Sequence, residues 1–272
     1  MQMLSEPFQS AWQGQDVYEL LRHMDGDVYR QKEGRRTFRF QFEGRGYFAK
    51  VFSGIGWKAL ASHLIKFRRP IISAENEWRA IEQLHRLGIP TMRLVGYGRR
   101  GKNPARVESF IITEELAPTI SLEDYCRNWL STPPPPTLKR ALVRRVAEVA
   151  RMLHDNGISH RDLYICHFLL DTSVPPLDSG GKLARLFIID LHRAWQHRNL
   201  GQRWRIKDVA GLFFSSLDIG LTHRDRLRFM ATYSNRPWQE ALRLNKTFWR
   251  RVERRAMAGY REFRRKNPDL FS

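Results

Sequence analysis

Cysteine is almost absent from this sequence, which has only 2 among its 272 residues. The two thiols, Cys126 and Cys166, are too few for a disulfide framework or a structural zinc site. Long apolar runs are also missing, because none approaches the ~20 residues that a membrane-spanning helix requires. Residues 1–7 show neither a basic start nor an apolar core, so no secretory signal is expected. These absences favour a globular protein of the cytoplasm.

Negative charge is scarce as well, since 28 Asp and Glu stand against 47 Lys and Arg, for a net charge of +19. Such a surplus implies an anionic partner: nucleic acid, an anionic membrane surface, a phosphorylated substrate or an acidic protein. The sequence lacks zinc-ligand spacing, an aromatic RNA-binding signature and heptads after a basic region, so no nucleic-acid partner is expected. A hydrophobic content of 42% excludes a mainly disordered chain.

One basic segment, residues 57–69, combines its charge with a helical pattern. Its apolar residues recur at 57, 60, 61, 64 and 65, which is the spacing of one face of an amphipathic helix. The simpler interpretation is a surface helix that packs on its own domain. The alternative is a helix that docks on an anionic membrane or an acidic protein.

The first part of the chain is predicted to be rich in strands. Residues 27–52 alternate apolar and polar side chains around two glycine-containing turns, which indicates a three-stranded meander. A helix is predicted from Ser73, as its N-cap, to Gly88, and two strands at 92–97 and 109–113. Residues 114–118 interrupt this pattern and indicate a boundary.

The remainder is predicted to be mostly helical. The prolines at 133–136 stop one helix, and Thr137 is expected to cap the next, which ends at Gly157. Two short strands follow near 168–170 and 186–189, and the pattern is helical from Trp204 onward. The prediction is an α+β, two-lobed protein, with a β-rich lobe at 1–115 and an α-rich lobe at 116–272.

Chemistry-bearing residues occur at the junctions of these elements. His160, Arg161 and Asp162 lie between a helix and a short strand, Asp190 ends the next strand, and Lys50 lies in the middle of an upstream strand. Taken alone, Lys50 is most simply interpreted as a lysine on an edge strand, and Asp162 and Asp190 as loop carboxylates that cap backbone amides. Their joint order resembles the protein-kinase-like fold, with its H-R-D-x-x-x-x-N and D-F-G motifs.

The resemblance to that fold implies a role for each residue. Asp162 corresponds to the catalytic base, Lys50 to the phosphate-binding lysine and Asp190 to the metal ligand. Glu77 corresponds to the helix glutamate that pairs with the lysine, although Glu75 lies two residues earlier and competes for this assignment. Three further residues are assigned to structural support of the loop that carries Asp162: His160, Arg161 and Asp208.

Three departures from the kinase pattern narrow the prediction. No G-x-G-x-x-G precedes Lys50, and the turn at 33–36 contains two arginines, so arginine is expected to replace part of the backbone cradle for phosphate. His167 occupies the place of the second metal ligand, Asn. Because imidazole is a poor ligand for Mg²⁺, either that second metal site is weakened or absent, or His167 contacts phosphate directly, which we favour.

Only 18 residues (208 − 190) separate Asp190 from Asp208, which is too short for a peptide-substrate platform and favours a small or lipid-linked hydroxyl acceptor.

Several motifs resemble the lipopolysaccharide core heptose(I) kinases, a lipopolysaccharide kinase family of the protein-kinase-like fold. The matching segments are Tyr47-Phe48-Ala49-Lys50, Thr113-Glu114-Glu115-Leu116, residues 160–170, residues 189–194 and residues 203–208. The resemblance implies ATP- and Mg²⁺-dependent phosphorylation of the first inner-core heptose, with Glu114 and Leu116 among the ATP-binding residues. It also suggests acyl carrier protein as an acidic partner and peripheral contact with the inner face of the inner membrane. Two alternatives are a kinase for another small-molecule or protein hydroxyl, and a basic nucleic-acid-binding protein.

Overall fold

The computed structural model describes residues 1–32, 34–57, 60–61 and 71–268. The chain divides into two compact units. The first unit comprises Met1–Ala117 together with Asp190–Arg193, and the second comprises Pro118–Ile189 together with Ala194–Ser272. The basic segment predicted as a helix at 57–69 lies almost wholly outside the described residues.

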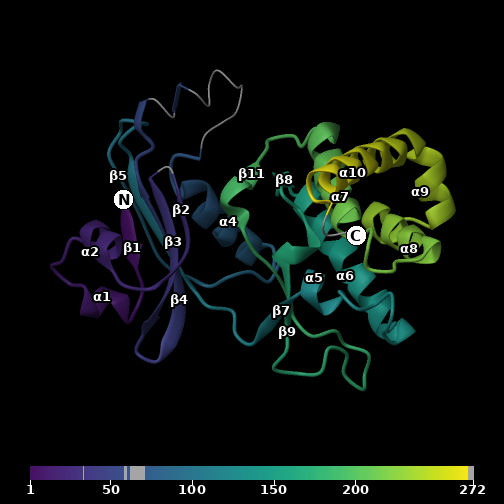
Figure 1. The fold of residues 1–272 in the computed structure, drawn as a ribbon, viewed down its shortest axis with the longest axis horizontal. Helices are drawn as coiled ribbons and strands as arrows, with labels where there is room; N and C mark the ends of the chain where they lie inside the picture. Colours follow the sequence, from purple (N-terminus) through teal and green to yellow (C-terminus); the bar gives the residue numbers. More distant parts are fainter. Residues whose placement is uncertain (33, 58–59, 62–70, 269–272) are drawn as a thin grey trace. The chain divides into compact units, whose positions relative to one another are not determined.

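A six-stranded antiparallel sheet forms the centre of the first unit (Figure 1). Its strand order is β1-β5-β6-β4-β3-β2. The strands are β1 (Gln2–Leu4), β2 (Asp27–Lys32), β3 (Arg35–Phe42), β4 (Arg45–Ser53), β5 (Leu94–Arg100) and β6 (Glu108–Glu114). The predicted meander is confirmed as β2, β3 and β4, and the alternation of apolar residues gives β3 and β4 one buried face each.

Helices cover both faces of this sheet, with α1 and α2 on one side and α4 on the other (Figure 1). The helices are α1 (Phe8–Ala11), α2 (Val17–His23) and α4 (Glu75–Arg86). On the first face, the ring centroid of Phe8 lies 4.8 Å from that of Tyr47 and 4.9 Å from that of Phe42. On the second face, Trp78 of α4 stacks on Tyr97 of β5 with ring centroids 4.7 Å apart.

The start of α4 differs from the prediction. The helix begins at Glu75, and the cap position is Ala74, which has no side chain that could accept a hydrogen bond. Oγ of Ser73 accepts a hydrogen bond of 3.3 Å from the amide of Glu75, and the amide of Ala74 donates to Oγ of Ser109 on β6, at 2.9 Å, so the sheet also holds the residue before the helix. Gly88 follows the helix with a φ of +67°, as expected for a glycine that ends it.

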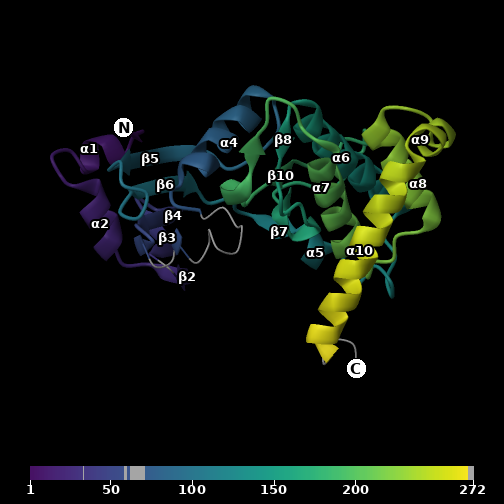
Figure 2. The ribbon, with the colours of Figure 1, turned by 90° about the horizontal axis from the view of Figure 1, so that it is seen from above.

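The second unit is predominantly helical (Figure 2). Its helices are α5 (Leu122–Tyr125), α6 (Pro136–Asp155), α7 (Gln202–Ser215), α8 (His223–Ser234), α9 (Trp238–Leu244) and α10 (Lys246–Lys266). Strands β7 (Thr119–Ser121), β9 (Phe168–Asp171) and β10 (Leu186–Ile188) form a small antiparallel sheet, and β8 (Ile158–Ser159) pairs with β11 (Trp195–Gln196). The sheet-rich first unit and the helical second unit agree with the α+β prediction.

The predicted start of the long helix in this unit is wrong. Helix α6 begins at Pro136, so Thr137 lies within its first turn and does not cap it. Proline suits this first position because it has no amide hydrogen and its φ is already helical. Asp208 lies in the second turn of α7, which begins at Gln202. No helix among the described residues is long and apolar enough to cross a membrane.

Candidate active site

Lys50 lies in the interior of the first unit's sheet. Its strand, β4, is hydrogen-bonded to β3 on one side and to β6 on the other, which excludes the edge-strand interpretation. Its Nζ lies 2.5 Å from Oε1 of Glu77 on α4 and 3.5 Å from Oδ1 of Asp190. The side chain of Glu77 is only 2% exposed, whereas Glu75 binds Arg79 on the helix surface. The lysine therefore pairs with Glu77, and the competing residue has another partner.

Asp190 adopts an unusual backbone conformation. Its φ is +60°, in the left-handed region that non-glycine residues seldom occupy. Its Oδ1 lies 2.5 Å from Nδ1 of His192, which belongs to the short 3₁₀ helix η2 (Leu191–Arg193). His192 was not recognised from the sequence, although it stands in the third place of the D-F-G-like motif. Strained backbone of this kind is concentrated at functional sites.

In the second unit, Asp208 holds the loop that carries Asp162. Asp208 is fully buried, and its carboxylate accepts hydrogen bonds from the amides of His160 at 2.8 Å and Arg161 at 2.7 Å. Arg161 has a φ of +74°, and its guanidinium lies 4.9 Å from the ring centroid of Trp204. The two amide bonds stabilise a conformation that a free loop would rarely adopt.

The histidine rings of this loop connect it to the neighbouring strand. Nε2 of His160 donates to the carbonyl oxygen of Ile189 at 3.0 Å, and Ile189 immediately precedes Asp190 in the chain. The ring of His160 stacks on that of His167, with centroids 5.7 Å apart. Nδ1 of His167 donates to the carbonyl oxygen of Asp162 at 2.8 Å, because a carbonyl can only accept.

Asp162 has a cationic neighbour that the sequence did not reveal. Nζ of Lys207, on α7, lies 3.5 Å from Oδ1 of Asp162 and also donates to the carbonyl oxygen of Arg161. The side chain of Asp162 is 15% exposed. Lys207 directly precedes Asp208, so both residues of one helical turn contact the loop. The adjacency of Lys207 and Asp208 in the sequence was the only signal from which this contact of Lys207 could have been predicted.

Glu114 is the last residue of β6, and Leu116 lies two residues further along the chain. Oε1 of Glu114 lies 3.0 Å from Nη1 of Arg93, so its carboxylate is already in an ion pair. The neighbouring Glu115 binds Arg39 with two hydrogen bonds of 2.7 and 2.9 Å. Any contact of Glu114 with a nucleotide would therefore fall to its main chain, and the assignment of both residues stays a prediction.

The described residues contain no cluster of three or more His, Cys, Asp or Glu side chains that could hold a metal ion by themselves. Asp190 belongs to the first unit and His167 to the second. Mg²⁺ in phosphoryl-transfer enzymes is typically held by one or two carboxylates, substrate phosphates and water. The hard oxygen donors of Asp190 fit that pattern, whereas the imidazole of His167 does not.

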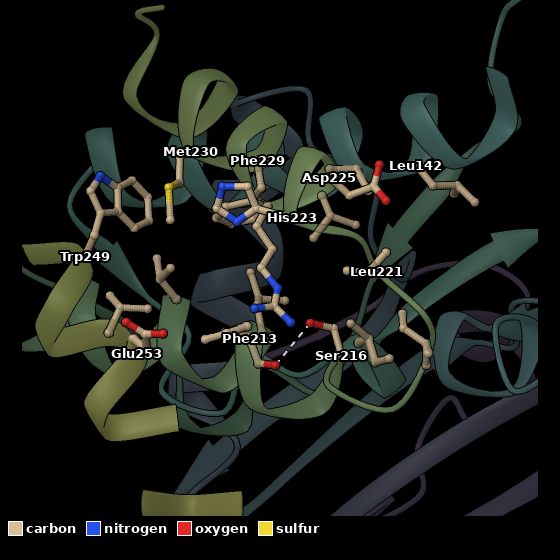
Figure 3. A pocket seen from close by; sticks show the side chains of 18 of the residues that line it. Leu142, Phe213, Ser216, Leu221, His223, Asp225, Phe229, Met230, Trp249 and Glu253 are labelled. Carbon is tan, nitrogen blue, oxygen red and sulfur yellow. Dashed lines mark hydrogen bonds between the residues drawn. The ribbon is translucent and has the colours of Figure 1, made fainter. Parts of the chain in front are cut away.

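A separate apolar cavity of about 380 Å³ lies within the second unit (Figure 3). Apolar side chains from α6, α7, α8 and α10 form most of its wall, among them Leu142, Phe213, Phe229, Met230 and Trp249, and Leu221 joins them from the loop before α8. Burial raises the pKa of the Cys126 thiol, which also lines it, to about 12. The cavity was not predicted, since its residues come together only through helix packing.

A sheet with an internal Lys–Glu pair, a left-handed aspartate after a strand and a braced His-Arg-Asp loop define a phosphotransferase of the protein-kinase-like class. Residues 19–233 match the lipopolysaccharide kinase (Kdo/WaaP) family, and the chain belongs to this family. Membership confirms the predicted kinase activity and implies ATP as co-substrate.

Two relatives are named lipopolysaccharide core heptose(I) kinase WaaP. The protein from Pseudomonas aeruginosa is 51% identical over 241 residues, which is 89% of each chain. The protein from Escherichia coli is 44% identical over 253 residues, which is 93% of this chain and 94% of that one. The solved structure of WaaP in complex with acyl carrier protein has a TM-score of 0.83 and 46% identity, covering 96% of this chain and 99% of that one. The predicted fold is confirmed by this likeness.

Proposed function

We propose that this protein transfers the terminal phosphoryl group of ATP to a hydroxyl of the first heptose in the lipopolysaccharide inner core. The observation that carries this proposal is the 51% identity, over about nine-tenths of both chains, to a protein named heptose(I) kinase. The short interval between Asp190 and Asp208 supports a non-peptide acceptor. Helix α7 begins at Gln202, soon after Asp190, and the chain between them is too short for the segment on which protein kinases bind peptides.

Asp162 is the proposed catalytic base. Phosphoryl transfer requires little covalent help from the enzyme, so a carboxylate mainly orients the acceptor hydroxyl and takes its proton late. Lys207 lies 3.5 Å from the Asp162 carboxylate and stabilises its charged, acceptor form. Asp208 fixes the amides of His160 and Arg161, the two residues before Asp162. The backbone that carries the Asp162 carboxylate therefore has little freedom to turn away from the acceptor.

ATP phosphates are assigned to the first unit and the acceptor to the second. Lys50, positioned by Glu77, neutralises phosphate charge, and the main chain at Glu114 and Leu116 contacts the nucleotide base. Asp190 would hold Mg²⁺, which neutralises charge on the phosphate oxygens when bound. His167 is kept in place by its bond to Asp162 and contacts phosphate. Asp190→Ala should abolish Mg²⁺-dependent ATP binding, and unchanged affinity would reject that assignment.

Acyl carrier protein is the proposed protein partner, since the structural relative was solved in complex with it. The surplus of 19 positive charges suits an acidic protein, and the apolar cavity suits a fatty acyl chain. Acylated carrier protein should raise the melting temperature more than the unacylated form. Val143→Trp, which fills the cavity, should remove this difference, whereas Val174→Trp on an exposed loop should not. An equal shift by both carrier forms would contradict acyl binding.

The proposed location is the cytoplasm, with peripheral contact at the inner face of the inner membrane, where ATP and a lipid-linked acceptor meet. The activity is tested by incubating the purified protein with radiolabelled ATP, Mg²⁺ and lipopolysaccharide from cells that lack heptose phosphate. We expect label in the lipopolysaccharide and none in peptides. Label in peptides alone would favour a protein kinase. Salt-sensitive binding to DNA or RNA without any transfer would favour the nucleic-acid alternative.

A further inference from the structure

Two side chains on β3 share a face with Lys50. The register between β3 and β4 pairs Thr37 with Lys50 and Arg35 with Phe52. Directly paired residues project to the same side of a sheet, and residues two apart on a strand do so too. Arg35 and Thr37 therefore lie on the face that α4 and its Glu77 cover.

Arg36 behaves differently, although it stands next to Arg35 in the same turn. Its side chain projects to the opposite face and donates hydrogen bonds to the carbonyl oxygens of Arg22, at 3.1 Å, and Met24, at 2.8 Å. These bonds tie β3 to the end of α2. Of the two arginines that the sequence offers in place of a glycine-rich loop, only Arg35 faces the side of the lysine.

Buried polar atoms without a hydrogen-bond partner gather around Lys50. Within the described part of the chain, they include Oγ1 of Thr37, Nε of Arg35 and Oε2 of Glu77. Leaving such groups unbonded costs free energy, and most buried polar atoms in proteins are satisfied. Three of them on one face indicate a site prepared for a polar ligand.

The charge of Arg35 points to an anionic ligand. Its guanidinium lies 5.3 Å from the ring centroid of Phe52, and no carboxylate of the described residues forms an ion pair with it. Burial lowers the pKa of Arg35, and the negative charges of Glu77 and Asp190 act in the opposite direction. Arg35 is thus a partly desolvated cation that lies close to the Lys50 group and has no ion-pair partner among the residues that the structure describes.

The residue directly before Arg35, Gly34, is held by its backbone. Gly34 has a φ of +71°, and its carbonyl oxygen accepts a hydrogen bond of 2.8 Å from the amide of Ser53. A Cβ at Gly34 would collide with the carbonyl oxygen of Gly54, so only glycine fits there. This bond to Ser53 holds the backbone next to Arg35 in advance of binding, which reduces the entropy that a ligand contact would cost.

We propose that the Arg35 guanidinium and the Thr37 hydroxyl bind the phosphates of ATP beside Lys50, in place of the amides of a glycine-rich loop. Guanidinium forms paired, charge-assisted hydrogen bonds with phosphate oxygens, and a hydroxyl donates one more. The inference rests on the proposed kinase function. It adds two ligand-binding residues to the site that Lys50, Glu77 and Asp190 form.

The test is calorimetric binding of a non-hydrolysable ATP analogue with Mg²⁺, and of adenosine, to the full-length protein. Arg35→Gln should raise the dissociation constant of the analogue by about 10- to 100-fold, the range for a lost charge-assisted hydrogen bond. Thr37→Val, which keeps the shape of the side chain, should raise it about 5-fold or more. Neither change should alter adenosine binding. The control Arg45→Gln removes one exposed charge from β4 and should bind the analogue like the parent.

Stability in the absence of nucleotide separates a binding role from a structural one. Because Arg35 and Thr37 have buried, unbonded atoms, both variants should melt at the temperature of the parent or above it. A lower melting temperature with unchanged affinity would overturn the inference, as would parental affinity in both variants. If the parent itself fails to bind the analogue, the kinase function fails, which is a distinct result.

Discussion

The amides of His160 and Arg161 converge on the carboxylate of Asp208, and this arrangement explains the geometry of the catalytic loop. Arg161 has a positive φ that would be costly without such bonds. Asp208 is also bonded, at 3.3 Å, to His154, whose other ring nitrogen is bonded to Tyr233. Burial raises the pKa of Tyr233 to about 12, so this phenol stays protonated throughout the physiological range.

At the residue scale, the first prediction concerns Asp162. Asp162→Ala should lower the rate of phosphoryl transfer by at least ~10², the usual loss for a general base, because no group then orients the acceptor hydroxyl. ATP affinity should stay at the parental value. Steady-state kinetics and calorimetry measure both, with Asp178→Asn, in an exposed hairpin, as the control. Parental turnover in Asp162→Ala would remove this residue from the mechanism.

The second prediction concerns the buried pair of Lys50 and Glu77. Lys50→Met leaves the Glu77 carboxylate buried without its ammonium partner, which should lower the free energy of unfolding by about 3 kcal/mol. The double variant Lys50→Met/Glu77→Met should recover most of this loss, since neither member of the pair is then left buried without its partner. Both should be inactive. Urea denaturation measures the stabilities. Equal stability of the single and double variants would mean that the pair is not energetically coupled.

The chemistry-bearing residues of the sequence could be recognised because the order of a lysine, a glutamate and two aspartates is itself informative. The structure resolves what spacing could not, namely that Lys50 pairs with Glu77 while Glu75 binds Arg79. Lys207 was missed for a physical reason. A long side chain can reach a loop 46 residues away in sequence, and no periodicity records that reach.

At the scale of elements, strands were predicted better than helix starts. Alternation of apolar residues depends only on which face is buried, and β3 and β4 follow it closely. Helix starts depend on what satisfies the first amides. At α4, Ser73 accepts from the amide of Glu75, but the helix begins one residue later than predicted, and Ser109 of a distant strand bonds the amide of Ala74. Tertiary contacts of this type are not visible in a local pattern.

The third prediction concerns the capping box of α8, where Thr222 and Asp225 bond each other's amides. Burial acts to raise the pKa of Asp225, but hydrogen bonds from Thr222 and the charge of Lys139 outweigh it, so the pKa is lowered. A lowered pKa means that ionised Asp225 stabilises the fold above the ordinary aspartate value of ~3.9 and loses that effect as pH falls below it.

Two variants test this capping box. Thr222→Ala should cost about 1 kcal/mol of stability, the typical value for a lost N-cap. Asp225→Asn should destabilise at pH 7, and its difference from the parent should shrink as the pH falls from about 5 to 3. Thermal unfolding over this range measures the difference. A difference that stays constant with pH would contradict the assigned role of the ionised carboxylate.

At the scale of the whole molecule, the net charge of +19 favours contact with anionic partners. The fourth prediction assigns membrane or carrier-protein contact to the basic segment at 57–69. Replacing Lys58, Lys66, Arg68 and Arg69 with Gln should weaken sedimentation with anionic vesicles, most strongly at low salt, where screening is least.

The matched control for the basic segment removes four exposed charges from α10. It replaces Arg250, Arg251, Arg254 and Arg255 with Gln, so both variants have a net charge of +15 (19 − 4). If the two variants lose vesicle binding equally, the interaction depends on overall charge and not on residues 57–69. If the variant of residues 57–69 sediments with vesicles like the parent, these residues take no part in vesicle binding.

The most direct test of the proposed function is mass spectrometry of core oligosaccharide from cells that lack this protein and are complemented with either the parent or Asp162→Ala. The account predicts that the oligosaccharide lacks one phosphate on the first heptose without the protein, regains it with the parent and does not regain it with the variant. An unchanged phosphate content in cells without the protein, or full restoration by Asp162→Ala, would contradict the account.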